Sequence, residues 1–190
     1  MGWQTTDTRV FEQIAEQHRD WDLVKILAEG DSWFAYPRQF LLAGRPANII
    51  DHLAAEENLL ILNTAANGDE ILDMIAGEQK FSLLKRLYHM EFDMVMLSGG
   101  GNDLVGRYDF GFLLHSFKDG MDWPDCIHRR HLDLKLRQVE LAFRELIERI
   151  LDIHPKMPIV THTYDFAVPS PVGFELFDIF PVGRSWMQPY

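Results

Sequence analysis

Hydrophobic residues along the chain form two kinds of pattern, short continuous runs and stripes with helical spacing. The runs are rich in β-forming residues and end at turn-forming residues, so they predict buried strands over residues 23–27, 59–62, 94–97 and 158–163. The stripes recur every three or four positions and predict helices over residues 5–20, 48–56, 69–76, 81–88 and 131–151. Because strands and helices alternate, the sequence predicts an α/β fold with a mainly parallel sheet covered on both faces.

The same pattern predicts where some helices begin and which way they face. Thr6 or Asp7 is expected to cap the first helix, Asn48 the second and Asp69 the third. The apolar stripe of the fourth helix is expected to face the core, and it consists of Phe81, Leu84, Leu87 and Tyr88.

Two segments lack such a pattern. Residues 104–130 contain three glycines and Pro124 among several aromatic residues. An irregular segment of this length in a compact domain is usually a lid, a binding loop or a packed insertion. After Asp165 we expect neither strand nor helix, and six of the nine prolines of the chain lie from Pro155 onward.

Composition and charge are those of an ordinary globular domain. With 190 residues, 47% of them hydrophobic and 25% charged, the chain has the length of one domain with a substantial core. A formal net charge of -11 argues against nucleic acid or an anionic membrane surface as the main partner. The single cysteine, Cys126, excludes an internal disulfide. Without a signal-peptide pattern or an apolar run that could cross a bilayer, we expect a cytoplasmic location.

The first predicted strand leads directly into a candidate nucleophile. Its apolar run is followed by Gly30, Asp31 and Ser32, which predicts a tight turn at the carboxyl end of the strand. Ligands and reacting groups gather at this edge of open α/β sheets, so Ser32 is a candidate nucleophile. In the alternative interpretation, Asp31 or Ser32 only caps a following helix.

Three short segments, each just after a predicted strand, carry a family resemblance. Gly30-Asp31-Ser32 comes first, Gly68 ends the segment after the second strand, and Gly100-Gly101-Asn102-Asp103 follows the third. In this order and context they resemble the first three blocks of the SGNH (GDSL-type) hydrolases, over roughly residues 22–165. The resemblance implies a three-layer α/β/α sandwich of the flavodoxin-like SGNH type. It also implies hydrolysis of a small-molecule ester without a metal or another cofactor.

The resemblance assigns catalytic roles to Ser32, Gly68 and Asn102. Ser32 would attack the ester carbonyl and form an acyl-enzyme. Its own backbone N–H, that of Gly68 and the amide of Asn102 would bind the oxyanion. Substrate contacts are predicted for Asp31, Trp33, Asp103 and His162. In the alternative interpretation Gly68 only ends a strand, and Asn102 and Asp103 only stabilise a turn or cap a helix.

The general base is not assigned by these segments. The family's Asp-x-x-His block lies near the C-terminus after a fifth strand, whereas no histidine follows His162 here. Asp125 and His128 have the spacing but precede the long helix, and His162 ends the fourth strand; both histidines stay candidates. We therefore expect residues 1–190 to be a single SGNH-like domain shortened at its C-terminus, without the last strand and helix. Residues 165–190 would then be an irregular tail, and activity would be low without the base.

Two other chemistries are disfavoured by the motifs. Gly99-Gly100-Gly101 resembles a phosphate-binding loop, but the Lys-Ser or Lys-Thr of a Walker site does not follow it. The Gly-x-Ser-x-Gly of α/β-hydrolases is absent, because Phe34 stands at its last position.

The competing hypothesis is a catalytically silent domain that uses the pocket for binding. The sequence does not identify the ester. Either the aromatic residues near the motifs bind an apolar acyl or ring group of the substrate, or they belong to the core; they are Trp33, Phe34, Tyr36, Tyr108 and Phe110.

Overall fold

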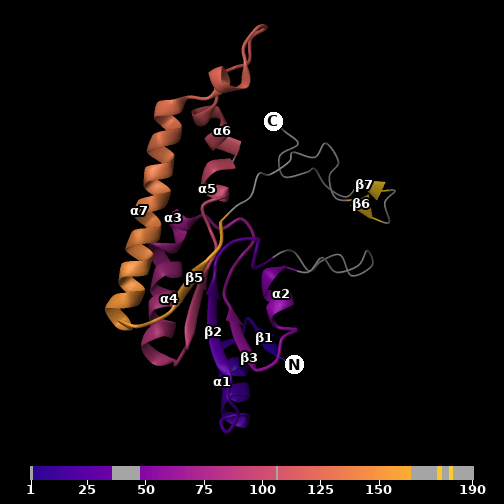
Figure 1. The fold of residues 1–190 in the computed structure, drawn as a ribbon, viewed down its shortest axis with the longest axis vertical. Coiled ribbons are helices and arrows are strands. Elements are labelled where there is room, and N and C mark those ends of the chain that lie inside the picture. Colours follow the sequence, from indigo (N-terminus) through magenta and orange to yellow (C-terminus); the bar gives the residue numbers. More distant parts are fainter. Residues whose placement is uncertain (1, 36–47, 106, 164–174, 177–179, 182–190) are drawn as a thin grey trace.

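The centre of the fold is a parallel sheet. The computed structural model describes residues 2–35, 48–105, 107–163, 175–176 and 180–181, and in it five strands pair in the order β1-β3-β2-β4-β5 (Figure 1). All of these pairings are parallel. The strands are β1 (Trp3–Thr5), β2 (Val24–Glu29), β3 (Leu59–Asn63), β4 (Met94–Leu97) and β5 (Ile159–Thr161). The prediction of an α/β fold with a mainly parallel sheet is confirmed.

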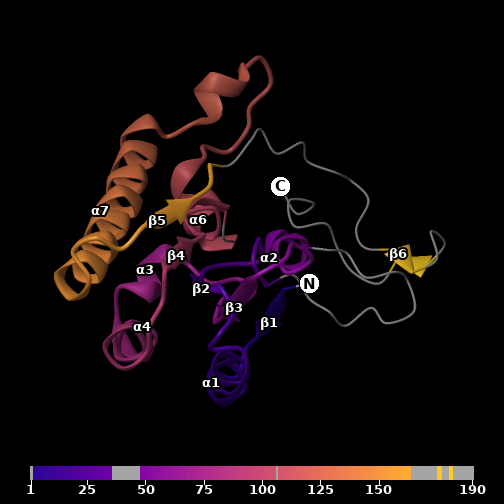
Figure 2. The same cartoon turned by 60° about the horizontal axis from the view of Figure 1, so that its bottom comes forward.

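Helices cover both faces of the sheet (Figure 2). One face packs against α1 (Thr8–Gln17), α3 (Ile71–Met74), α4 (Gly77–His89) and α7 (Arg129–Ile153), and the other against α2 (Ile49–Leu53). Along β2, Leu27 joins the core cluster on the first face, while Ile26 and Ala28 join the cluster on the second. Because both faces are covered, the inner strands β3 and β4 are apolar almost throughout. Among the described helices, none combines the length and the apolar character needed to span a membrane.

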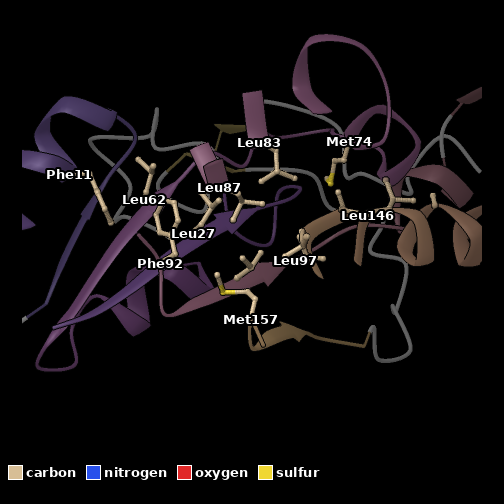
Figure 3. Close-up of a cluster of buried hydrophobic side chains, with 14 of the residues drawn as sticks. Phe11, Leu27, Leu62, Met74, Leu83, Leu87, Phe92, Leu97, Leu146 and Met157 are labelled. Carbon is tan, nitrogen blue, oxygen red and sulfur yellow. The ribbon is translucent and has the colours of Figure 1, made fainter. Parts of the chain in front are cut away.

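The larger core cluster lies between the sheet and the helices of the first face (Figure 3). Leu27 and Leu97 come from the strands, and Leu83, Leu87 and Leu146 come from α4 and α7; each is at most 1% exposed. Burial of one such side chain contributes about 1.5–3 kcal/mol to folding. The cluster therefore holds the two long helices on the sheet.

Two of the expected helix caps are present. Asp7 caps α1, and its Oδ1 accepts a hydrogen bond of 2.7 Å from the backbone N–H of Arg9. Asn48 caps α2 in a capping box, in which Asn48 Oδ1 accepts from the N–H of Asp51 at 2.9 Å and the Asp51 carboxylate accepts from the N–H of Asn48 at 3.2 Å. Of the two caps proposed for the first helix, Asp7 is the one observed.

The start of the chain differs from the prediction. Residues 3–5 form β1, and α1 begins only at Thr8, so the predicted helix over residues 5–20 begins too early. β1 pairs with β3, which places Trp3 beside Leu60. A three-residue strand has no period of its own, and its partner strand lies far away in the sequence. The strand therefore could not be found from local pattern.

The face that α4 turns to the core also differs from the prediction. Leu83 and Leu87 are fully buried, whereas Phe81 and Tyr88, both expected inside, are 66% and 69% exposed. Leu83 and Leu87 are four residues apart and so lie on one face of the helix. The prediction counted the large aromatic side chains next to this face as part of it. The size and apolar character of side chains do not by themselves determine which face of a helix packs against the core.

The segment predicted to be irregular, residues 104–130, is partly helical. It includes the end of α5 (Asn102–Val105), all of α6 (Arg107–Leu113) and the 3-10 helix η1 (Trp123–Cys126). We call residues 107–128 the helical insert. In it α6 lies beside the N-terminal part of α7, where Lys135 and Asp109 form an ion pair of 2.9 Å (Figure 1). This part of α7 extends beyond the sheet, so Leu136, expected in the core stripe, is 46% exposed.

A short hairpin occurs in the C-terminal segment. β6 (Glu175–Leu176) pairs antiparallel with β7 (Phe180–Pro181), so the expectation of no strand after Asp165 is wrong. The other residues of that tail lie outside the described residues, as do Tyr36 and the side chain of Tyr108.

Alanine substitutions on α4 test its observed orientation. We expect Leu83→Ala to lower the free energy of unfolding by about 2–5 kcal/mol, because it leaves a cavity in the core. Phe81→Ala, at an exposed position of the same helix, is the control and should change it by less than about 0.5 kcal/mol. Urea unfolding followed by circular dichroism measures both values. A larger loss for Phe81→Ala than for Leu83→Ala would contradict the orientation.

Candidate active site at the carboxyl edge of the sheet

The turn that carries Ser32 begins where β2 and β4 lie very close together. The N–H of Ser98 donates to the carbonyl of Glu29 at 3.1 Å. A Cβ on Gly30 would lie 2.6 Å from both the Cβ and the carbonyl oxygen of Ser98, so only glycine fits here. The chain then turns, with the N–H of Phe34 donating to the carbonyl of Asp31 at 3.1 Å. Ser32 lies in this turn, half-buried, and its hydroxyl makes no hydrogen bond to another described residue.

The second motif segment lies beside this turn. The N–H of Thr64 donates to the carbonyl of Ala28 at 2.8 Å, and the N–H of Ala66 donates to the carbonyl of Gly30 at 2.9 Å. Gly68 is exposed and has a φ of 91°, which favours glycine; a side chain there would meet no other atom within 4 Å. The backbone conformation, and not crowding, therefore accounts for glycine at position 68.

The third motif segment is tied to the second through Asn102. Its Nδ2 donates to the backbone carbonyl of Asp69, the residue after Gly68, at 2.9 Å. Together with the Ala66–Gly30 hydrogen bond, this contact joins the three segments that follow β2, β3 and β4. The structure thus brings the segments of Ser32, Gly68 and Asn102 to one edge of the sheet.

Asp103 is fully buried and holds the start of α3. Its Oδ2 accepts from the N–H of Ile71 at 2.9 Å and its Oδ1 from the N–H of Leu72 at 3.3 Å. Asp69, expected as this cap, is not the N-cap, and the N-cap residue Glu70 makes no capping bond with its side chain. Burial raises the pKa of Asp103, and the hydrogen bonds from the two backbone amides partly oppose this. The substrate contact expected of Asp103 stays a prediction, while its observed contacts are those of a helix cap.

A buried chain of hydrogen bonds links Asp31, Ser98 and His162. The Ser98 hydroxyl donates to Asp31 Oδ1 at 2.5 Å and lies 2.9 Å from His162 Nε2. Because that hydroxyl has a single proton and gives it to the carboxylate, Ser98 Oγ accepts from the Nε2–H of His162. Asp31 Oδ1 also accepts from the N–H of Trp33 at 3.0 Å. Sequence reasoning overlooked Ser98, although it directly follows a predicted strand.

The imidazole of His162 lies against the turn that carries Ser32. Its ring centre is 5.6 Å from that of Trp33 and 5.8 Å from that of Phe34. Phe34 itself is buried in the core cluster of the α2 face, whereas Trp33 is 48% exposed. The structure therefore places His162 beside the residues that follow Ser32, as its predicted position at the end of β5 requires.

The other candidate pair, Asp125 and His128, belongs to the helical insert. The ring of His128 lies 4.1 Å from that of His115 and 3.8 Å from that of His131. Partial desolvation and these two neighbouring imidazoles lower the pKa of His128. None of these ring contacts involves the Ser32 turn. Among the described residues, no group of three or more histidine, cysteine or acidic side chains has the arrangement of a metal site.

A second network, which is partly buried and which sequence reasoning missed, surrounds Glu29 at the end of β2. Glu29 is 1% exposed, and its carboxyl group contacts the hydroxyl of Thr64 at 2.6 Å and Gln79 Nε2 at 3.0 Å. Gln79 Nε2 also donates to Asp69 Oδ2 at 2.8 Å. Burial raises the pKa of both Glu29 and Asp69, and the hydrogen bond from Gln79 partly offsets each shift. The sequence did contain one indication of this network. Glu29 is charged, yet it lies two residues after Leu27 in the same strand and so points toward the same core.

The raised pKa of Glu29 predicts a pH-dependent cost to folding. Above its usual pKa of 4.5 the unfolded chain has lost this proton while the folded chain still holds it, so stability falls as pH rises through this window. Glu29→Gln removes this contribution. As pH rises, the free energy of unfolding of the variant should increase relative to that of the wild type by up to about 1.4 kcal/mol per pH unit. The increase ends once the Glu29 carboxyl group of the folded wild type has lost its proton.

Urea unfolding between about pH 4.5 and 8, across the ordinary range of a perturbed carboxyl group, measures this difference. Glu16→Gln, whose side chain is 75% exposed, is the matched control and should run parallel to the wild type. A constant difference between Glu29→Gln and the wild type at every pH would show that Glu29 has the same pKa in both states.

Comparison with known proteins gives matches among solved structures. No protein-family model matches the chain, and no curated protein matches it significantly. AlinE4, an SGNH-hydrolase family esterase, is 21% identical with a TM-score of 0.43, over 73% of this chain and 58% of that one. A member of the lipolytic G-D-S-L family from Veillonella parvula DSM 2008 is 15% identical with a TM-score of 0.30, over 70% of this chain and 100% of that one. LAE5, an alpha/beta hydrolase enzyme from the metagenome of Lake Arreo, Spain, is 17% identical with a TM-score of 0.32, over 72% and 76% of the two chains. The chain thus spans 58% of the length of AlinE4.

Proposed function

We propose that this chain is a serine hydrolase domain of the SGNH type that cleaves carboxylic esters. The observation that carries the proposal is the meeting of three motif segments at one sheet edge. They follow three adjacent parallel strands and are joined by the Ala66–Gly30 and Asn102–Asp69 hydrogen bonds. An acyl transfer needs a hydroxyl and several oxyanion donors at one place, and these segments supply both kinds of group.

In the proposed reaction Ser32 Oγ attacks the carbonyl carbon of the ester. The tetrahedral oxyanion accepts hydrogen bonds from the backbone N–H groups of Ser32 and Gly68 and from the amide of Asn102. An amide nitrogen carries two hydrogens, and Asn102 uses one of them on the carbonyl of Asp69. The second hydrogen is then available to the substrate. The alcohol leaves, an acyl group stays on Ser32, and water releases it as the acid.

The proton of Ser32 needs an acceptor, and we assign this role to His162. Its ring lies against Trp33 and Phe34, directly after Ser32. However, Nε2 of this ring is hydrogen-bonded to Ser98 at 2.9 Å. By the assignment above Nε2 carries a hydrogen, so it can take the Ser32 proton only after the ring leaves Ser98 and that hydrogen moves to Nδ1. Ser32 is therefore weakly activated, and we expect slow turnover.

The hydrogen bonding of Ser32 and His162 supports a second candidate function. The Ser32 hydroxyl has no hydrogen-bond partner among the described residues, and the Nε2 of the neighbouring imidazole is engaged by Ser98. An unassisted serine is a poor nucleophile at neutral pH. The alternative is a catalytically silent domain of this fold that binds a ligand at the same edge.

Ester hydrolysis by three variants tests the roles of the motif residues. We expect the wild type to hydrolyse short p-nitrophenyl esters slowly and Ser32→Ala to fall to the buffer rate. Asn102→Ala should lose about 10²–10³ in kcat, the usual effect of removing one oxyanion donor. Ser116→Ala, an exposed serine in the helical insert, is the control and should match the wild type. Equal rates for the wild type and Ser32→Ala would refute the assignment of the nucleophile.

Labelling with a fluorophosphonate distinguishes the hydrolase from the silent domain. An activated serine reacts with this probe, and peptide mapping should find the label on Ser32 of the wild type and none on Ser32→Ala. His162→Ala should slow the labelling, because it removes the proposed proton acceptor. A folded wild type that stays unlabelled at long times would favour the silent domain.

A further inference from the structure

We propose that Gln79 is a positioning residue for the oxyanion donor Asn102, acting through Asp69. The proposal deepens the proposed function and depends on it for its catalytic part. Gln79 belongs to α4, outside all of the motif segments. Its side chain nevertheless bridges the end of β2 to the loop that carries Gly68.

The geometry of the bridge fixes the amide of Gln79. Its Nε2 lies 3.0 Å from Glu29 Oε1 and 2.8 Å from Asp69 Oδ2, so each of its two hydrogens has an acceptor. The reversed amide would turn an oxygen toward two carboxyl groups, which is unfavourable when either group is ionised. Glu29 is itself held by the hydroxyl of Thr64 at 2.6 Å, so the bridge has a fixed support.

Asp69 passes this constraint on to Asn102. Its side chain accepts from Gln79 Nε2, its backbone N–H donates to the carbonyl of Ala66 at 3.3 Å, and its own carbonyl accepts from Asn102 Nδ2 at 2.9 Å. The last bond uses one hydrogen of the Asn102 amide and so fixes the direction of the other. That other hydrogen is the one assigned to the oxyanion. Without Gln79, Asp69 keeps its backbone hydrogen bonds, but its side chain loses the hydrogen bond from Gln79 Nε2.

Folding alone does not account for a carboxyl group at position 29. Glu29 is 1% exposed and continues the core-facing series of Leu27, where an apolar side chain would bury without desolvating a charge. Arg86 attracts the carboxylate, but Asp69 repels it, and burial raises the pKa of Glu29. A buried carboxyl group is costly unless it has hydrogen-bond partners, and here Glu29 contacts both Thr64 and Gln79. The contacts of this network join the end of β2 and α4 to the loop between β3 and α3.

Gln79→Met removes the bridge and keeps the length of the side chain. Lys80→Met, the next residue on α4, is the matched control, because it removes only the contact of Lys80 with Glu145 at 3.1 Å. We expect Gln79→Met to lower kcat for p-nitrophenyl esters about tenfold with KM changed less than about twofold, since oxyanion contacts form in the transition state. The unfolding midpoint of Gln79→Met should be lower than that of Lys80→Met, because the buried Glu29 loses a donor, so kcat is measured at a temperature well below both midpoints.

A double-mutant cycle separates positioning from a general loss of stability. In the Asn102→Ala background Gln79→Met should have no further effect on kcat, because the two residues act through one hydrogen bond. Full additivity of the two losses would overturn the route through Asn102. An unchanged kcat in Gln79→Met alone would overturn the catalytic part of the proposal.

NMR of the Asn102 side chain tests the positioning role of Gln79 separately from the proposed hydrolase function, because it does not depend on enzyme activity. The Asn102 side-chain amide gives a pair of NMR signals, identified by their loss in Asn102→Ala. In the wild type we expect two well-separated signals, and in Gln79→Met signals that converge and exchange faster with water. Unchanged Asn102 signals in Gln79→Met would refute the positioning role whatever the enzyme does. If the Asn102 signals change in Gln79→Met but the wild type neither hydrolyses esters nor reacts with the fluorophosphonate, the positioning role stands and the hydrolase is refuted.

Discussion

The close approach of β2 and β4 at Gly30 is the constraint on which the site depends. Because the atoms of Ser98 lie where a Cβ on Gly30 would be, any other residue would push the two strand ends apart. The acidic residues on either side of Gly30 then reach two separate sets of partners. Glu29 contacts Thr64 and Gln79, and Asp31 contacts Ser98. One glycine thus keeps both polar networks next to the Ser32 turn.

The charge of these networks bears on the chemistry at the same edge. A developing oxyanion is repelled by ionised carboxylates, and several carboxyl groups lie in the surrounding segments. Burial raises the pKa of Glu29, Asp69 and Asp103, which favours their neutral forms relative to exposed carboxyl groups. The same desolvation that costs stability therefore opposes ionisation of these groups near the proposed oxyanion site. Hydrogen bonds from Gln79 and from backbone amides hold these groups in place without adding a full charge.

Local pattern was enough to predict most of the sheet and the segments that follow it. β3 and β4 are continuous apolar runs that end in polar or glycine residues, and Gly30 marks the turn before Ser32. The contacts that build the site join residues far apart in sequence. Asp103 lies 32 residues from Ile71, whose amide it accepts, and Gln79 lies 50 residues from Glu29. No local period encodes such pairs, so the cap of α3 and the role of α4 became visible only in the fold.

In the proposed mechanism, the difference between a catalyst and a silent domain depends on the hydroxyl that His162 contacts. Ser98 gives its proton to Asp31, so it offers the imidazole only an acceptor oxygen. If the ring exchanged Ser98 for Ser32, the carboxylate of Asp31 would keep both Ser98 and the N–H of Trp33 as donors. The exchange would therefore leave no buried carboxylate without a partner, which is the expensive outcome in a protein interior. The partners of Asp31 therefore do not by themselves hold His162 on Ser98. For the proposed reaction the ring must also move its hydrogen from Nε2 to Nδ1, because only an unprotonated nitrogen can accept the proton of Ser32.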